Sequence, residues 1–270
     1  MRRFFASIFR FKCVKDIFVF LLLVCLTSFS VAQELTIYTE DWPPVNFKNG
    51  NAVDGMAVDL VRALQARIGG HQEIRLVPWA RGYKAVLEEP NVMLFSVGRT
   101  PEREKLMRLL GPIAISDTVL YTRKGQAERL RSLRDGIYSL PVGAYRSSIF
   151  VDVAKKKGFQ HIEQANSPQI EANMLLAGRF DMLVESSVAI NQILKGIGRN
   201  SSEIEKLTVL DSLELYLAFS LNTSPEIFNA WENALRAAKK DGSFQKIYQK
   251  WFPDEMPPMD VQRLGPADRP

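Results

Sequence analysis

Segments with strand and helix character alternate along residues 35–251, and the alternation runs twice. The first round opens with a strand over residues 35–39 and a helix over residues 55–68, where apolar residues recur at helical spacing. The second round opens with a strand over residues 138–143 and a helix over residues 147–156. This alternation predicts an α/β protein, and the repetition predicts two sheets, each flanked by helices.

Two stretches between the rounds, residues 118–125 and 214–222, also have strand character. Two strands that cross from one block to the other would form a hinge between them. About 240 residues suffice for two lobes of about 100 residues each. The sequence therefore predicts a two-lobed molecule with two hinge strands.

The first 32 residues have the pattern of a cleaved signal peptide. Five Lys and Arg residues open the segment, an apolar run covers residues 17–26, and Ser30-Val31-Ala32 supplies small residues at the cleavage positions. The apolar run is shorter than the roughly 20 residues of a membrane span. We expect residues 1–32 to be removed on export; the alternative is an uncleaved N-terminal anchor.

Removal of that segment changes the charge and the chemistry that the chain can offer. It holds five of the 35 Lys and Arg residues and one of the 30 acids, so 30 bases and 29 acids remain. The chain then has no basic excess to indicate nucleic-acid binding. Both cysteines, Cys13 and Cys25, are lost with it, which excludes a disulfide framework and a thiol nucleophile.

The remaining imidazoles, His71 and His161, lie far apart in the sequence. A zinc site or a Ser-His-Asp triad is therefore not expected, and we predict no catalytic residue, no metal and no cofactor. After Phe252 the chain is rich in proline. We predict that residues 254–270 form a flexible tail.

Five short motifs occur in a characteristic order along residues 35–252. They are LTIYTEDWPP at 35–44, DGMAVDL at 54–60, TPER at 100–103, LAGRFD at 176–181, and DGSF at 241–244 followed by Trp251. Through them the chain resembles the family-3 bacterial extracellular solute-binding proteins, the polar-amino-acid type of periplasmic binding protein.

The resemblance implies the two-lobed type II periplasmic binding protein fold. It places residues 33–122 and 215–253 in lobe 1 and residues 123–214 in lobe 2, because the C-terminal helices of that family return to the first lobe. It also implies a periplasmic, non-enzymatic protein that captures a small polar, carboxylate-bearing, amino-acid-like ligand by lobe closure. The implied partner is an inner-membrane ABC permease. Nothing in the sequence indicates an obligate oligomer, so we expect a monomer.

Arg103 is the first candidate for a ligand contact, because its planar guanidinium can hold a carboxylate with two hydrogen bonds. The resemblance gives the matching arginine this role, toward the ligand's α-carboxylate. It also assigns ligand contacts to Ser96 and Gly98 in lobe 1 and to Ser148 in lobe 2. Trp42, in a loop at a strand end, can cover an apolar part of the ligand or stack on a cation.

Four further residues are candidates with open alternatives. Arg81 and Arg99 would add cationic groups for a ligand with several anionic groups, or would be solvated or paired with nearby glutamates. The family has an ammonium-binding Asp in lobe 2 where this chain has Ser186, with Glu185 beside it. Either Glu185 replaces that Asp, or the ligand is not an ordinary α-amino acid.

Two other functions remain open from the sequence. The protein could report ligand occupancy to a membrane sensor, which uses the same closure. It could also be a cleft enzyme similar to the dehydratases of this fold, with Glu185 as the acid, although no second acid–base partner is evident.

Overall fold

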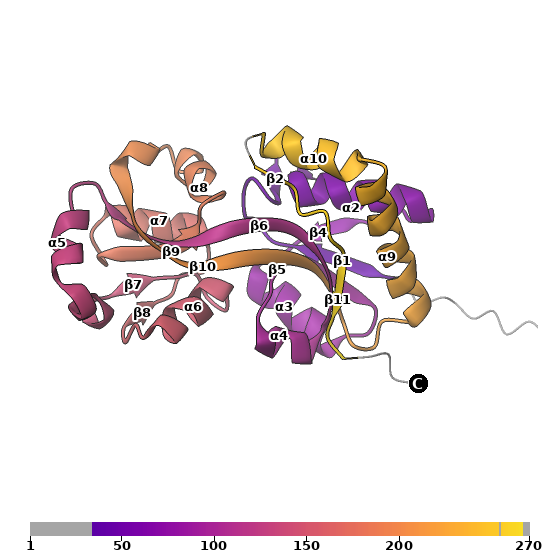
Figure 1. The fold of residues 1–270 in the computed structure, drawn as a ribbon, viewed down its shortest axis with the longest axis horizontal. Coiled ribbons are helices and arrows are strands. Elements are labelled where there is room, and N and C mark those ends of the chain that lie inside the picture. The colour runs from indigo at the N-terminus through magenta and orange to yellow at the C-terminus, as the bar shows by residue number, and fades with distance from the viewer. Residues whose placement is uncertain (1–33, 254, 267–270) are drawn as a thin grey trace, which may run out of the picture. The chain divides into compact units, whose positions relative to one another are not determined.

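The computed structural model describes residues 34–253 and 255–266. The expected signal peptide lies outside these residues. The described chain forms a mixed α/β fold in which one sheet of nine strands is flanked by helices (Figure 1). The sheet runs in the order β4 (Ile74–Leu76), β1 (Thr36–Thr39), β5 (Val92–Gly98), β10 (Ile204–Phe219), β6 (Arg108–Arg123), β9 (Met182–Ser186), β7 (Val142–Gly143) and β8 (Ile162–Glu163), with β11 (Gln262–Leu264) paired to β6.

Strands β6 and β10 run side by side through the whole sheet, and each is 16 residues long (Figure 1). The predicted strands at 118–125 and 214–222 are therefore confirmed but are longer than expected. The two predicted sheets are one continuous sheet, because β6 and β10 belong to both of its halves.

We call the β4, β1 and β5 half, with its helices, lobe 1, and the β9, β7 and β8 half lobe 2. Residues 118–122 of β6 pair with β9, and residues 215–219 of β10 pair with β5. The strands thus pass from one lobe to the other near Ser116–Asp117, which pair with Leu213 and Ser212. The sequence instead ends the first part of lobe 1 at residue 122.

The helices pack around the two halves of the sheet. In lobe 1, α9 and α10 from the end of the chain pack on α2 and on each other, as expected from the resemblance. The helices of lobe 1 are α2 (Met56–Ile68), α3 (Trp79–Glu88), α4 (Pro101–Leu106), α9 (Pro225–Lys240) and α10 (Ser243–Trp251). Those of lobe 2 are α5 (Ala127–Ser132), α6 (Ile149–Lys157), α7 (Pro168–Leu176) and α8 (Ile190–Gly196), with 3-10 helices at Arg134–Ser139 and Ser201–Glu203.

The same start signal precedes α4, α7 and α9. Each begins with proline after a Thr or Ser N-cap, and the cap hydroxyl accepts a hydrogen bond from the backbone amide three residues later. Such a cap stabilises a helix by about 1 kcal/mol. For α4 the donor is the amide of Arg103, so the cap at Thr100 fixes the backbone of the main candidate residue.

Part of the expected flexible tail is structured. Residues Gln262–Leu264 form β11, which pairs antiparallel with Leu109–Gly111 of β6. The prolines that suggested disorder lie on either side of β11, and a segment without proline has every amide free to pair. A short antiparallel hairpin of β2 (Phe47–Asn49) and β3 (Ala52–Asp54) also forms, with Gly50 and Asn51 in its turn. Among the described helices, none is long and apolar enough to cross a membrane.

Candidate functional site

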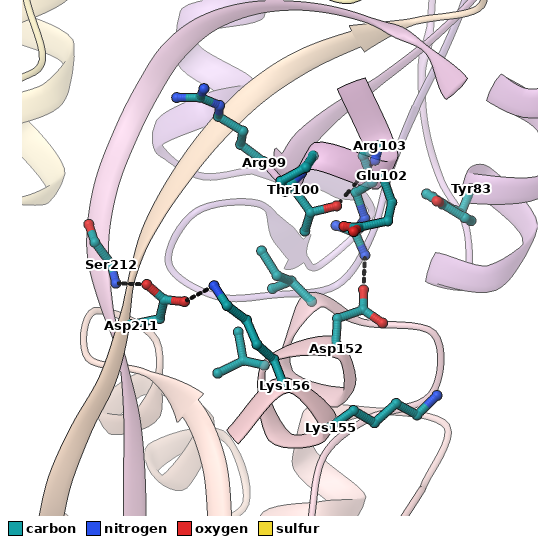
Figure 2. Close-up of a pocket in the computed structure, with 13 residues that line it drawn as sticks. Tyr83, Arg99, Thr100, Glu102, Arg103, Asp152, Lys155, Lys156, Asp211 and Ser212 are labelled. Atoms are coloured by element: carbon teal, nitrogen blue, oxygen red, sulfur yellow. Dashed lines mark hydrogen bonds and ion pairs between the residues drawn. The ribbon is translucent and has the colours of Figure 1, made fainter. Parts of the chain in front are cut away.

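Arg103 is buried between the two lobes. Its side chain projects from α4 and the residue is 3% exposed. The guanidinium donates to the carbonyl oxygens of Gly98 at 3.0 Å and of Ser147, from lobe 2, at 3.4 Å. Within the described part of the chain its one carboxylate contact, to Oδ2 of Asp152 on α6, is long at 3.5 Å (Figure 2). A guanidinium whose hydrogen bonds go mainly to neutral carbonyl oxygens can still bind a carboxylate strongly.

Two aromatic rings of α3 flank this guanidinium. The Arg103 Cζ lies 5.4 Å from the ring centre of Trp79 and 5.2 Å from that of Tyr83. The two rings stack on each other with centres 5.5 Å apart. The Trp79 indole also donates to the Ser147 carbonyl at 2.7 Å. The rings therefore hold the cation in place and help to join α3 to lobe 2.

Two other predicted contacts, Ser96 and Gly98, line one cavity with Arg103, and a third, Ser148, follows its partner Ser147 in the chain. Ser96 and Gly98 lie at the end of β5, and Ser148 is the residue before α6. The hydroxyls of Ser96 and Ser148 are buried, and neither has a hydrogen-bond partner among the described residues. Ser96 also adopts a left-handed backbone with φ of 65°, which is uncommon for a residue with a side chain. Unsatisfied buried hydroxyls are costly, and such groups mark candidate ligand-binding positions.

Two buried carboxyls, one in each lobe, accept hydrogen bonds from aromatic side chains of the other lobe. The Tyr145 hydroxyl of lobe 2 donates to Glu40 of lobe 1 at 3.1 Å. In the other direction, the Trp42 indole of lobe 1 donates to Glu185 of lobe 2 at 3.2 Å. Phe150 packs against both aromatic rings. These reciprocal hydrogen bonds join the loop after β1 to lobe 2.

Burial sets the protonation of these acids. It raises the pKa of Glu40 to about 8, against the lowering effects of the Tyr145 hydrogen bond and the Arg103 charge. It raises the pKa of Glu185 to about 8 as well, although hydrogen bonds from the Ser186 amide and Trp42 oppose the shift. A third buried acid, Glu171 on α7, has its pKa raised by burial to about 9. At neutral pH these carboxyls are therefore mostly protonated.

The structure separates Glu185 from Ser186. Adjacent side chains of a strand point to opposite faces. Glu185 reaches Trp42, whereas the Ser186 hydroxyl lies 2.8 Å from that of Ser116 where the strands pass between the lobes. Of these two neighbours, Glu185 is the one that contacts lobe 1 through Trp42. Both alternatives from the sequence, replacement of the Asp by Glu185 and a ligand of another kind, stay open.

Of the other two arginines, Arg99 lines a cavity with Arg103 but is already paired, and Arg81 lies outside that cavity. Arg99 pairs with Glu104 at 2.6 Å and with Glu214 at 3.1 Å, and these carboxylates raise its pKa. Its side chain points away from the Arg103 guanidinium (Figure 2). Arg81 is exposed on α3 and lines neither of the two cavities around Arg103.

Those two cavities differ in size. The inner one measures about 10 Å³, room for about one water molecule. It is lined by Glu40, Trp42, Trp79, Ser96, Gly98, Arg103, Tyr145, Ile149, Phe150, Leu213 and Leu215. The outer one measures about 490 Å³ and has charged walls from α4, α6 and β10 (Figure 2). Arg103 and Ile149 line both, so they lie between the packed interior and the open side.

Sequence reasoning missed half of this site. Glu40, Tyr145, Trp79, Tyr83 and Asp152 were not predicted, although Glu40 lies within the first quoted motif and Tyr145 is three residues before Ser148. The signal that could have found Glu40 is an acid at the end of the first strand, the edge where α/β sheets bind ligands. The described residues hold no cluster of His, Cys, Asp and Glu suited to a metal, and both histidines are exposed.

Comparison with known proteins shows which family this arrangement belongs to. The family model of the bacterial extracellular solute-binding proteins, family 3, matches residues 35–254. A curated relative, the arginine-binding extracellular protein ArtP of Bacillus subtilis, is 19% identical over 219 residues, which are 80% of this chain and 84% of that protein.

Solved structures agree on the fold. A histidine kinase sensor domain with similarity to periplasmic binding proteins has a TM-score of 0.71 and is 20% identical, over 83% of this chain and 98% of that one. An ancestral amino acid-binding protein, described as a precursor of cyclohexadienyl dehydratase, has a TM-score of 0.69 and is 24% identical, over 81% and 95% of the two chains.

Proposed function

We propose, from the premise that this chain belongs to the bacterial extracellular solute-binding proteins of family 3, that it captures an amino acid between its lobes. The captured ligand would pass to an inner-membrane ABC permease. The proposed contacts are Arg103, Ser96 and Gly98 with Trp42 from lobe 1, and Ser148 and Glu185 from lobe 2. Arg81, Arg99 and Ser186 are left out because they lie outside the cluster or are already paired.

The observation that carries this proposal is the environment of Arg103. Its guanidinium is buried, yet its nearest carboxylate oxygen is 3.5 Å away on a half-exposed side chain. The hydroxyls of Ser96 and Ser148, both among the predicted contacts, lack hydrogen-bond partners in residues 34–253 and 255–266. A ligand carboxylate on Arg103, with those hydroxyls as further contacts, would satisfy all three groups.

The ligand we favour carries a positive charge as well as a carboxylate. Glu40 and Glu185 are buried acids from opposite lobes, and together they can hold a cationic group once they ionise. The curated relative described above is named for arginine binding. We therefore propose a cationic amino acid, with L-arginine as the first probe.

Binding requires the lobes to separate, because the inner cavity of about 10 Å³ is too small for an amino acid. Opening would break the Trp42–Glu185, Tyr145–Glu40 and Trp79–Ser147 hydrogen bonds. We place the hinge where β6 and β10 pass between the lobes, at residues 116–117 and 212–213. Both positions precede the boundaries expected from the resemblance, which follow residues 122 and 214. Closure around the ligand would then rebuild contacts between the lobes.

The experiment is calorimetric titration of the exported chain, refolded from denaturant to remove bound ligand. The panel is L-arginine, L-glutamine, L-glutamate and succinate, titrated into the parent, Arg103→Ala and the exposed control Arg75→Ala. We expect L-arginine to bind with micromolar Kd or tighter, Arg103→Ala to lose at least about 100-fold, and Arg75→Ala to match the parent. No binding by any panel compound, or an unchanged Kd for Arg103→Ala, rejects the proposal.

A sensor role is the second candidate, supported by the sensor-domain structure with a TM-score of 0.71. Capture and sensing use the same binding step. They separate at the partner: crosslinking in membranes should recover a permease for transport and a sensor kinase for signalling.

An enzymatic role is supported by two observations. The ancestral neighbour is described as a precursor of a dehydratase, and the cleft holds carboxyls that stay protonated near neutral pH, as a general acid must. Mass spectrometry of each panel compound after incubation decides this point, since a binding protein returns it unchanged.

A further inference from the structure

The C-terminal strap, residues 260–266, lies beyond the part of the chain that the family model matches, which ends at residue 254. Its strand β11 pairs with residues 109–111 of β6, on the edge of lobe 1 (Figure 1). At its start, the buried Lys239 of α9 donates to the carbonyl oxygens of Asp260 at 2.6 Å and of Pro112 at 2.7 Å. The strap is therefore fastened to both α9 and β6.

A line of polar contacts leads from the strap to α4. The Tyr216 hydroxyl lies 3.0 Å from Oε1 of Gln262 in the strap and 3.1 Å from Oε2 of Glu214, so its single proton serves one at a time. That Glu214 oxygen accepts from Arg99 at 3.1 Å. Arg99 in turn donates to Glu104 of α4 at 2.6 Å. Glu104 is the residue after Arg103.

The strap also touches α4 directly. Gly265 has φ of 105°, and its Cα sits so close to the end of α4 that an added Cβ would fall on the Met107 carbonyl oxygen and lie 3.3 Å from that of Glu104. Only glycine fits this backbone without displacing one of the two segments. The strap thus contacts the C-terminal end of α4 directly. It is also linked to Glu104, in the middle of α4, by the polar contacts through Tyr216, Glu214 and Arg99.

A six-residue helix cannot hold its own position, because short helices depend on tertiary contacts. Lobe 1 offers α4 the Thr100 cap at one end and the strap at the other. We propose that the C-terminal strap positions α4, and through it the Arg103 guanidinium, so that Gln262 and Gly265 are positioning residues for the ligand's carboxylate. This inference rests on the role proposed for Arg103.

The test compares Gln262→Ala and Gly265→Ala with Arg263→Ala. Arg263 is in the same strand, but its side chain points the other way, to Asn229 and Glu232 on α9. Hydrogen exchange of residues 101–107 should be about tenfold faster in the first two variants and unchanged in the control. This readout needs no ligand, and equal exchange in all three variants overturns the inference.

Affinity supplies the second readout. The Kd for L-arginine should rise about fivefold in Gln262→Ala and Gly265→Ala. In an Arg103→Lys background the same changes should add nothing, since the guanidinium they position is gone. Fully additive effects in that cycle mean that the strap supports only general stability. If Arg103→Ala itself leaves binding unchanged, the proposed function fails, and hydrogen exchange alone decides the positioning of α4.

Discussion

The indole nitrogen of Trp42 donates to Oε1 of Glu185 at 3.2 Å, a contact between residues 143 positions apart in the chain. Trp42 is 2% exposed and Glu185 is 1% exposed. The same carboxylate oxygen accepts from the backbone amide of Ser186 at 2.6 Å. The position of this acid is thus set by both lobes, and its protonation has consequences that can be measured.

The first prediction concerns stability and pH. The folded pKa of Glu185 is about 8 against an ordinary value of 4.5, so the native state binds a proton that the unfolded chain releases between those values. The contribution of the Glu185 carboxyl to the free energy of unfolding should therefore be largest below about pH 4.5 and should fall as the pH rises toward 8. Glu185→Gln, which stays neutral, should be more stable than the parent at pH 8 by on the order of 4 kcal/mol.

Urea unfolding of parent and variant at pH 5 and pH 8 measures this difference. The two curves should nearly coincide at pH 5 and separate at pH 8. The exposed Glu88→Gln serves as control and should follow the parent at both values. A Glu185→Gln protein that is less stable than the parent at pH 8 would show that the carboxylate is favoured in the fold.

The second prediction separates stability from binding at Ser148. Its buried hydroxyl has no partner, so Ser148→Ala removes an unsatisfied group and should raise the free energy of unfolding by up to about 1 kcal/mol. The Kd for L-arginine should rise about fivefold to tenfold, because the proposed ligand contact is lost. Thermal unfolding and calorimetry give the two values.

Ser220→Ala is the matched control for that experiment. Ser220 is equally buried, but its hydroxyl accepts from the Val92 amide at 3.1 Å and lies 3.0 Å from the Thr223 hydroxyl. Its loss should destabilise the protein by about 1 kcal/mol and leave the Kd unchanged. Equal destabilisation by both alanine variants would contradict a special role for Ser148.

The third prediction links ligand and proton. Glu40 and Glu185 both have pKa values of about 8, so a cationic ligand between them must drive protons off. We expect the affinity for L-arginine to weaken by about tenfold per pH unit below 8 for each carboxyl that ionises. Titration in phosphate and in Tris, whose ionisation enthalpies differ, counts the protons released. Equal affinity at pH 6 and pH 8 would exclude these acids from the binding of a cation.

The fourth prediction concerns export. If residues 1–32 are a signal peptide, the protein recovered from a periplasmic extract should begin at Gln33. Intact-mass spectrometry of that fraction reads this directly. A mass equal to the full 30.6 kDa chain, recovered from membranes, would favour the N-terminal anchor instead.

Local patterns predicted much of the fold because they depend on neighbouring residues. The Thr100-Pro101 start of α4 and the helical spacing in residues 55–68 are visible in the sequence, and both helices form. The length of β6 was missed because Gly111 and Pro112 interrupt its strand pattern, and pairing with β10 and β11 overrides that signal. Tertiary contacts decide strand length in such a case.

The candidate site, like the fold, was predicted only where the signal is local in the sequence. Arg103 was predicted from its motif, and the structure places it in one cavity with Ser96 and Gly98 and in contact with Ser147, the residue before Ser148. The hydrogen bonds between the lobes could not be predicted. Glu40, for example, pairs with Tyr145 across 105 positions of sequence. Spacing along one chain carries no information on which groups two lobes bring into contact.

The reciprocal pairs Trp42–Glu185 and Tyr145–Glu40 also set a threshold for selectivity. Every ligand has to displace the same two pairs, so its apparent affinity equals its intrinsic affinity scaled by the fraction of molecules already open. If the pairs favour closure by about 2 kcal/mol, all ligands lose about thirtyfold. Compounds that satisfy only part of the site then fall below useful affinity, although the ratio of affinities between any two ligands is unchanged.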